Sequence, residues 1–139
     1  MAFKVDENGN ITIIQGDSGN IIIEGLNTDK NYDVYFAIQD KNRNPVGDEL
    51  HVSSNGSQNV IFYLTGNYTD LLSVPKNDIC AVYYYGVKIC DTSENLEGTL
   101  ILGNSDIGDL NTITVYPKKV EGVTHQWQTQ ENKLILIEY

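Results

Sequence analysis

Hydrophobic and polar residues alternate with a period of two in short runs along the chain. The clearest run, Tyr32–Gln39, places Tyr, Val, Phe and Ile on one side and Asp, Ala and Gln on the other. The longest run, Ile79–Cys90, puts Tyr83 and Tyr85 on one face and Tyr84 on the opposite face. This alternation is typical of β-strands with one buried face, and the helical spacing of apolar residues is almost absent. We therefore predict an all-β protein.

Turn-forming residues separate these runs. Asn8-Gly9 predicts a hairpin turn between the first two strands, because Asn and Gly adopt the positive φ angles that such a turn requires. A helical turn is expected only at Tyr68–Ser73, where Pro75 would end it. Many short strands with frequent turns predict an immunoglobulin-like antiparallel β-sandwich of roughly seven to nine strands, formed by residues 1–122.

Residues 123–139 are predicted to form a C-terminal strand segment or arm. The stretch Lys133–Tyr139 is apolar on both faces, and an uncovered edge strand of this kind promotes aggregation. Two alternatives stay open. The segment is either the last strand of the sandwich or an arm that adds a strand to another subunit. Its candidate partner-binding residues are Trp127, Leu134, Ile135, Leu136 and Ile137.

The composition adds a strong acidic balance. The 139 residues include 9 Lys and Arg against 19 Asp and Glu, a net charge of −10. This charge repels the phosphates of nucleic acids and of anionic membranes, so neither is an expected partner. No apolar run approaches the roughly 20 residues of a membrane-spanning helix. Met1–Asn10 lacks the residue order of a signal peptide, so we expect a soluble intracellular product.

The residues that usually carry chemistry do not form a recognisable site. Cys80 and Cys90 lie on one predicted strand about 33 Å apart, too far for a disulfide, so we expect free thiols and no metal or cofactor. Residues 16–19 repeat the Gly-Asp-Ser-Gly letters around a protease nucleophile, but only His51 and His125 could serve as the base. We interpret this motif as a turn and expect no enzyme.

Two Asp-x-Asn-x-Asn runs, at residues 6–10 and 40–44, resemble the first half of a calcium-binding loop. Both lack the glycine at the sixth position and the glutamate at the twelfth position that such loops require. We therefore expect ordinary turns at both places.

Tyrosines gather at residues 83–85. Exposed tyrosine rings offer a contact surface for protein or carbohydrate, whereas buried ones fill the faces of a sheet. Both readings stay open for the group, and Tyr84, on the opposite face from its neighbours, is the candidate for partner binding.

Three segments carry a resemblance to a known family: Asn10–Gly19, Tyr32–Gln39 and Thr112–Gly122. They resemble small immunoglobulin-like sandwich proteins of tailed bacteriophage virions, most closely the N-terminal domain family of phage baseplate upper proteins. That family begins with a strand leading into a Gln-Gly-Asp motif, which is Gln15-Gly16-Asp17 here. The similarity covers residues 10–120. Family members usually continue into a long receptor-binding region, whereas this chain ends at Tyr139, so its size is more similar to that of a capsid decoration protein.

The resemblance implies a non-enzymatic structural protein of a phage virion. The leading expectation is a capsid decoration, or head accessory, protein on the particle surface, present in the host cytoplasm before assembly. Its expected partners are other capsid or tail proteins, with self-association possible. The alternatives are a structural or receptor-binding component of the tail or baseplate, and an acidic host-directed inhibitor that mimics nucleic acid.

Overall fold

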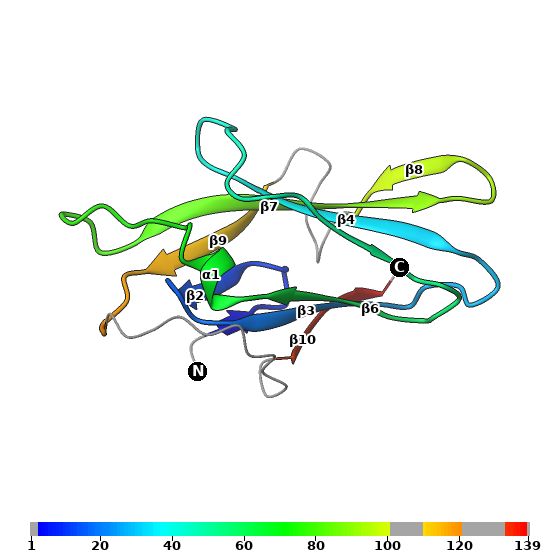
Figure 1. The fold of residues 1–139 in the computed structure, drawn as a ribbon, viewed down its shortest axis with the longest axis horizontal. Helices are drawn as coiled ribbons and strands as arrows, with labels where there is room; N and C mark the ends of the chain where they lie inside the picture. Colours follow the sequence, from blue (N-terminus) through cyan, green and yellow to red (C-terminus); the bar gives the residue numbers. More distant parts are fainter. Residues whose placement is uncertain (1–2, 101–109, 121–132, 139) are drawn as a thin grey trace.

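The computed structural model describes residues 3–100 and 110–120 and the backbone of 133–138. The described part contains ten strands and one four-residue helix, so the predicted all-β, sandwich-like fold is confirmed (Figure 1). The strands are β1 Phe3–Val5, β2 Ile11–Ile14, β3 Gly19–Glu24, β4 Tyr32–Gln39, β5 Leu50–Ser53, β6 Val60–Leu64, β7 Ala81–Asp91, β8 Leu96–Thr99, β9 Asn111–Tyr116 and β10 Lys133–Glu138, and the helix is α1 Gly66–Thr69.

Two sheets form the layers of the sandwich. The larger sheet has the order β1-β2-β9-β7-β4-β5, and β8 pairs with the far end of β7. The smaller sheet has the order β10-β3-β6. In Figure 1 the long strands β4 and β7 form the upper layer, and β3, β6 and β10 lie below them. The sheets approach each other where β5 meets β6 and where β1 meets β10.

The pairing within the sheets is mixed, which corrects the expectation of a purely antiparallel sandwich. β2 runs parallel to β9, with Ile11 opposite Ile113 and Ile14 opposite Tyr116. β10 runs parallel to β3 of the same chain, with Leu134 opposite Ile21. Alternation along a strand reveals which residues are buried, but it carries no information about the direction of a partner distant in sequence. The direction therefore could not be taken from the pattern.

The core lies between the inward faces of the two sheets. In β4 and β7 the predicted alternation is confirmed, because Phe36 and Val87 are buried while their neighbours in sequence are not. β7 begins at Ala81 rather than at the predicted Ile79, whose side chain is 82% exposed. The rings of Phe36 and Phe62 meet across the sandwich, with centroids 5.7 Å apart.

The local turns agree with the sequence at one predicted position and differ at another. The hairpin between β1 and β2 turns at Asn8-Gly9, as predicted, although only Gly9, at φ 82°, has the positive φ that was expected of both residues. The helical turn begins at Gly66, before the predicted Tyr68, because Thr65 caps it. The Thr65 hydroxyl oxygen accepts a hydrogen bond of 3.2 Å from the Tyr68 amide, which satisfies one unpaired donor of the first turn.

Both Asp-x-Asn-x-Asn runs form turns, as expected. The Asp6 carboxylate accepts hydrogen bonds from the amides of Asn8 and Asn10, each 2.9 Å long. The Asp40 carboxylate does the same for the amides of Asn42 and Asn44, at 2.8 and 3.0 Å. Each aspartate therefore organises its own loop. Cys80 and Cys90 are free, in agreement with the sequence.

Alanine substitutions at the consecutive β6 residues Phe62 and Tyr63 should compare the contribution of a core side chain with that of a surface side chain to the free energy of unfolding. Phe62 is 1% exposed and packs between the sheets, whereas Tyr63 is 45% exposed. We expect Phe62→Ala to lower the free energy of unfolding by about 3–5 kcal/mol, because it leaves a cavity. Tyr63→Ala should lower it by less than about 1 kcal/mol. Urea unfolding followed by circular dichroism measures both, and equal losses would contradict the sandwich core described here.

Candidate functional site

The larger sheet turns one face toward the core and the other outward. Strand register determines which outward side chains are neighbours: Asp33 lies opposite Cys90, Ala37 opposite Gly86, and Gln39 opposite Tyr84. On the other side of β7, Tyr84 lies opposite Thr112. The outward face is therefore a continuous surface across β2, β9, β7, β4 and β5.

The outward face divides into two regions of different chemistry. One region contains no charged residue, and we call it the neutral half. It covers β2, β9, the first part of β7 and the last part of β4. The neutral half consists of Thr12, Ile14, Ala37, Gln39, Val82, Tyr84, Gly86, Thr112, Thr114 and Tyr116. The neutral half is bordered by β1, on which the charged residue Lys4 lies opposite Thr12.

The neutral half is accessible. Val82 is 43% exposed and Tyr116 is 39% exposed, and both are among the large apolar or aromatic side chains that the described residues leave in solvent. Tyr84 is half-buried and lies on the opposite face from the buried Tyr83 and Tyr85, as the alternation predicts. The absence of charge and the presence of Tyr84 and Tyr116 are features that this surface shares with the cores of protein–protein interfaces.

The other region, the charged half, covers β5, the first part of β4, the end of β7 and β8. In it the Asp33 carboxylate oxygen Oδ1 accepts a 2.7 Å hydrogen bond from the Ser53 hydroxyl and lies 3.1 Å from His51 Nε2. The Ser53 hydrogen bond, followed by that of His51, lowers the pKa of Asp33. The His51 ring also stacks on Tyr35, with centroids 4.6 Å apart. The outward residues of this region are Asp33, Tyr35, His51, Ser53, Lys88, Cys90, Glu97 and Thr99.

This group contains Ser, His and Asp, but its geometry differs from that of a catalytic triad. In a triad the histidine lies between the serine and the aspartate, so that it takes the proton of the serine. Here the serine and the histidine both bind the same aspartate oxygen. The nearby Cys90 thiol donates to Glu97 at 3.4 Å, and burial, followed by this hydrogen bond, raises the pKa of Cys90. A protonated thiol is a weak nucleophile.

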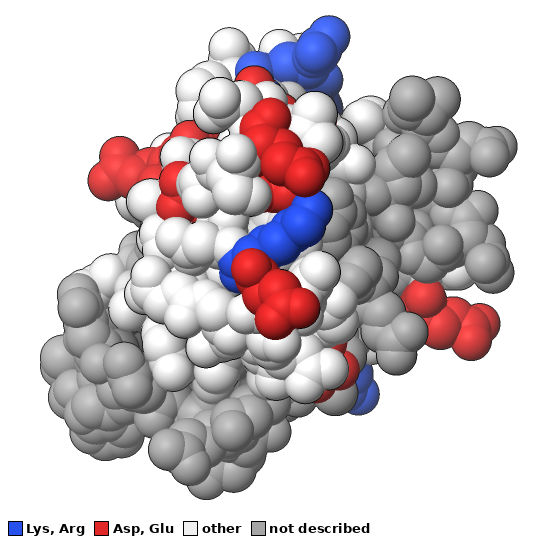
Figure 2. Space-filling view, turned by 90° about the vertical axis from the view of Figure 1, so that its right-hand side faces the viewer, with Lys and Arg blue, Asp and Glu red and all other residues white. Residues whose placement is uncertain are grey.

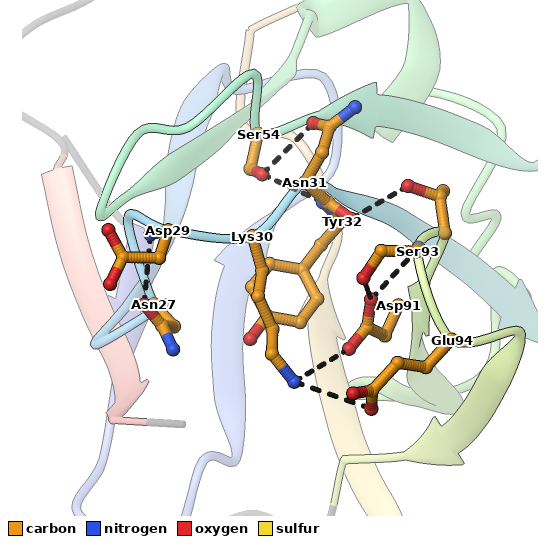
Figure 3. Close-up of polar contacts among 10 residues, drawn as sticks. Asn27, Asp29, Lys30, Asn31, Tyr32, Ser54, Asp91, Ser93 and Glu94 are labelled. Atoms are coloured by element: carbon orange, nitrogen blue, oxygen red, sulfur yellow. Dashed lines mark hydrogen bonds and ion pairs between the residues drawn. The ribbon is translucent and has the colours of Figure 1, made fainter.

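A second polar cluster lies at one end of the sandwich, where loops from both sheets meet (Figure 3). The Lys30 ammonium lies 3.0 Å from the Asp91 carboxylate and 3.5 Å from that of Glu94. Asp91 also accepts hydrogen bonds from the Ser93 hydroxyl at 2.7 Å and the Ser93 amide at 3.0 Å. Hydrogen bonds from Ser93 and then from Lys30 lower the pKa of Asp91 to about 2.

The same cluster ties a third loop to the end of the sandwich. The Tyr32 amide donates to the Ser54 hydroxyl at 2.9 Å, and the Asn55 amide donates to the Asn31 side-chain oxygen at 2.8 Å. The Thr92 hydroxyl donates to the Asn31 carbonyl at 2.9 Å. These polar groups bind one another, so the cluster holds loops together rather than presenting a site to a ligand.

Acidic side chains are distributed over this end of the molecule. Figure 2 shows them at several separate places, with basic side chains between them. A mimic of nucleic acid needs a continuous row of carboxylates to resemble a phosphate backbone. The distribution on this face does not favour the inhibitor alternative. Among the described residues, no group of three or more His, Cys, Asp or Glu is arranged to hold a metal ion.

The Gln15-Gly16-Asp17 motif fastens β2 to α1. The Gln15 side-chain amide donates to the Asp70 carbonyl at 2.8 Å, and the Asp17 carbonyl accepts from the Thr69 hydroxyl at 2.7 Å. Gly16 has φ 86°, which only glycine adopts without strain. Gly19 does not have such a φ. It is required for space instead, because a Cβ there would stand 2.3 Å from the Phe3 ring.

The residues predicted for partner binding fall in different places. Tyr84 lies in the neutral half. The backbones of Leu134, Ile135 and Ile137 pair with β3 of the same chain, with an irregularity in register around Leu136. Trp127 lies outside the described residues. The other members of the neutral half were not predicted, because only the pairing of four strands brings them together.

Comparison with protein-family models, with curated proteins and with solved structures found no match. No helix in the described part of the chain has the length and apolar character needed to cross a membrane.

Acid should remove the stabilisation that Asp91 provides. Because folding lowers the pKa of Asp91 from 3.8 to about 2, its stabilisation is fully present above pH 3.8 and is lost as the pH falls toward 2. Asp91→Asn should therefore lower the melting temperature at pH 7 and flatten its decline between these pH values. Glu94→Gln is the matched control, because it removes only the longer contact to Lys30. If the melting temperatures of the wild type and of Asp91→Asn fell by the same amount between pH 7 and pH 2, this role of Asp91 would be contradicted.

Proposed function

We propose that this chain is a non-enzymatic structural protein of a bacteriophage virion, a head accessory protein that acts by protein–protein contact. The observation that carries the proposal is the neutral half of the outward face. In a chain of net charge −10, ten neighbouring outward positions on four strands hold no charge. A surface that lacks charge and contains tyrosines is suited to burial against protein.

The chemistry of the remaining surface supports binding rather than turnover. In the charged half, Ser53 and His51 both contact the same carboxylate oxygen of Asp33. In the polar cluster at the end of the sandwich, the charged groups of Lys30 and Asp91 bind each other, and Asp91 also binds Ser93. Within the described residues, no buried side-chain nitrogen or oxygen lacks a hydrogen-bond partner.

The phage setting of the proposal comes from the resemblance of Gln15-Gly16-Asp17 and the neighbouring strands to phage sandwich domains. The contacts of Gln15 and Asp17 with Asp70 and Thr69 give this motif a structural role, which is to close the chain around α1. A motif with a structural role is a reasonable marker of a shared fold. It supports a virion sandwich protein without indicating a particular partner.

Mass spectrometry and cryo-electron microscopy of purified particles from the phage or prophage that encodes this chain test the proposal. We expect many copies on the shell, because a head accessory protein follows the capsid lattice. A few copies confined to the tail would replace the head assignment with the baseplate alternative. Absence from the particles would overturn the proposal and favour a host-directed inhibitor. The major capsid protein in the same sample is the internal reference for copy number.

A further inference from the structure

We infer that Asn55 is a site of spontaneous deamidation, a covalent modification in which the amide nitrogen of Gly56 attacks the Asn55 side chain. This inference goes beyond the proposed function and does not depend on it. Deamidation is fastest where glycine follows asparagine, because glycine has no side chain that obstructs the attack. The sequence contains two such pairs, Asn8-Gly9 and Asn55-Gly56. Their hydrogen bonds in the folded protein distinguish them.

The reaction consumes one water molecule and releases ammonia. The Gly56 nitrogen forms a bond to the side-chain carbon Cγ of Asn55, and its proton passes through solvent to the departing Nδ2, which leaves as ammonia. Water then opens the resulting five-membered succinimide at either of its two carbonyl carbons. One product is aspartate, and the other is isoaspartate, in which the main chain runs through Cβ and Cγ. Because the peptide group between the two residues must rotate before the attack, contacts that hold this group slow the reaction.

The peptide group between Asn8 and Gly9 is held on both sides. The Gly9 amide donates to the Asp6 carbonyl at 3.1 Å, and the Asn8 carbonyl accepts a 3.0 Å hydrogen bond from the Asn111 side chain. Gly9 is also buried, and its own carbonyl accepts a hydrogen bond from the Tyr85 hydroxyl. Deamidation of Asn8 therefore requires the first hairpin to open locally.

The peptide group between Asn55 and Gly56 is not held in this way. Asn55 is exposed, and no described residue forms a hydrogen bond with its carbonyl, with its side-chain amide or with the Gly56 amide. The nearest hydrogen bonds lie on either side of this peptide group. The Asn55 amide donates to the Asn31 side-chain oxygen, and the Ser57 amide donates to the Ser54 carbonyl, both at 2.8 Å. Rotation of the peptide group therefore breaks no hydrogen bond of its own.

The turn that contains Asn55 leads from β5 in the larger sheet to β6 in the smaller sheet. Its two central residues have positive φ, 50° at Asn55 and 78° at Gly56. Aspartate accepts such a φ about as well as asparagine, so this product fits the turn and adds one negative charge. Isoaspartate adds one main-chain atom within the turn that the Ser57 hydrogen bond closes. It therefore alters a connection between the two sheets.

Peptide mapping of the purified full chain during incubation at mildly alkaline pH tests the inference. Tandem mass spectrometry locates each residue that gains mass and distinguishes isoaspartate from aspartate. We expect Asn55 to deamidate at least about tenfold faster than Asn8, because two hydrogen bonds of the Asn8–Gly9 peptide group must break before Asn8 reacts. The rate at Asn55 should rise with pH, because the attacking nitrogen must lose its proton. A rate at Asn55 equal to or below that at Asn8 would overturn the inference.

The same incubation in urea is the matched control, because unfolding removes the contacts and keeps both Asn-Gly pairs. The two rates should then agree within about twofold. If Asn55 stayed tenfold faster in urea, the folded contacts would not be the cause and the inference from them would be overturned.

Two glycine substitutions provide a second readout, the ammonia that the folded protein releases. Asn55→Gly removes the reacting side chain and keeps a residue that accepts positive φ, so it should abolish most of the early release. Asn8→Gly is its counterpart at the protected pair and should leave the release unchanged. Equal reductions by the two substitutions would contradict the assignment of Asn55.

Discussion

The pairing of β4 with β7 is the constraint on which the rest of the structure depends. The two strands run antiparallel from Tyr32 opposite Asp91 to Gln39 opposite Tyr84. Because side chains alternate between faces, this one register decides at once which residues enter the core and which face outward. A shift of β4 against β7 by a single position would turn the buried side chains of one of the two strands outward, either the set that contains Phe36 or the set that contains Val87. The hydrophobic core therefore fixes the outward surface as firmly as it fixes the inward one.

Polar contacts then hold the ends of this strand pair in place. At one end, Lys30 and Asp91 join the loop before β4 to the end of β7, and burial within this cluster is compensated by hydrogen bonds from Ser93. At the other end, the buried hydroxyl of Tyr85 donates to the Gly9 carbonyl and thus attaches β7 to the first hairpin. Burial of the Tyr85 ring raises its pKa, so the hydroxyl keeps its proton and continues to donate. These polar contacts therefore hold β4 and β7 in place at the two ends of the pair, beyond the hydrophobic core.

Much of the fold could be predicted from the sequence, because the burial pattern of each strand is local information. The alternation in Tyr32–Gln39, the side of the sheet that holds Tyr84 and the hairpin turn at Gly9 are all confirmed. Two features depend on contacts between distant segments. The parallel pairing of β2 with β9 is one of them, and the grouping of Thr12 with Val82 and Thr114 is the other. Each residue of the neutral half is unremarkable in its own strand, so only the assembled sheet reveals a surface without charge.

The division of the outward face bears on how an acidic protein combines solubility with assembly. A net charge of −10 makes copies of the chain repel one another, and this repulsion opposes non-specific association through the exposed Val82 and Tyr116. Apart from Lys4 on β1, the outward charged residues of the described strands of this sheet, Asp33, Lys88 and Glu97, lie near β5 and β8. If they were spread evenly, every approach would bury a charge, and the cost of removing it from water would oppose any tight contact. Because these charges lie in one half, the other half can be removed from water without the free-energy cost of desolvating a charged side chain. On the larger sheet, as far as the structure describes it, the neutral half is therefore the region that a protein partner could cover without removing a charged side chain from water.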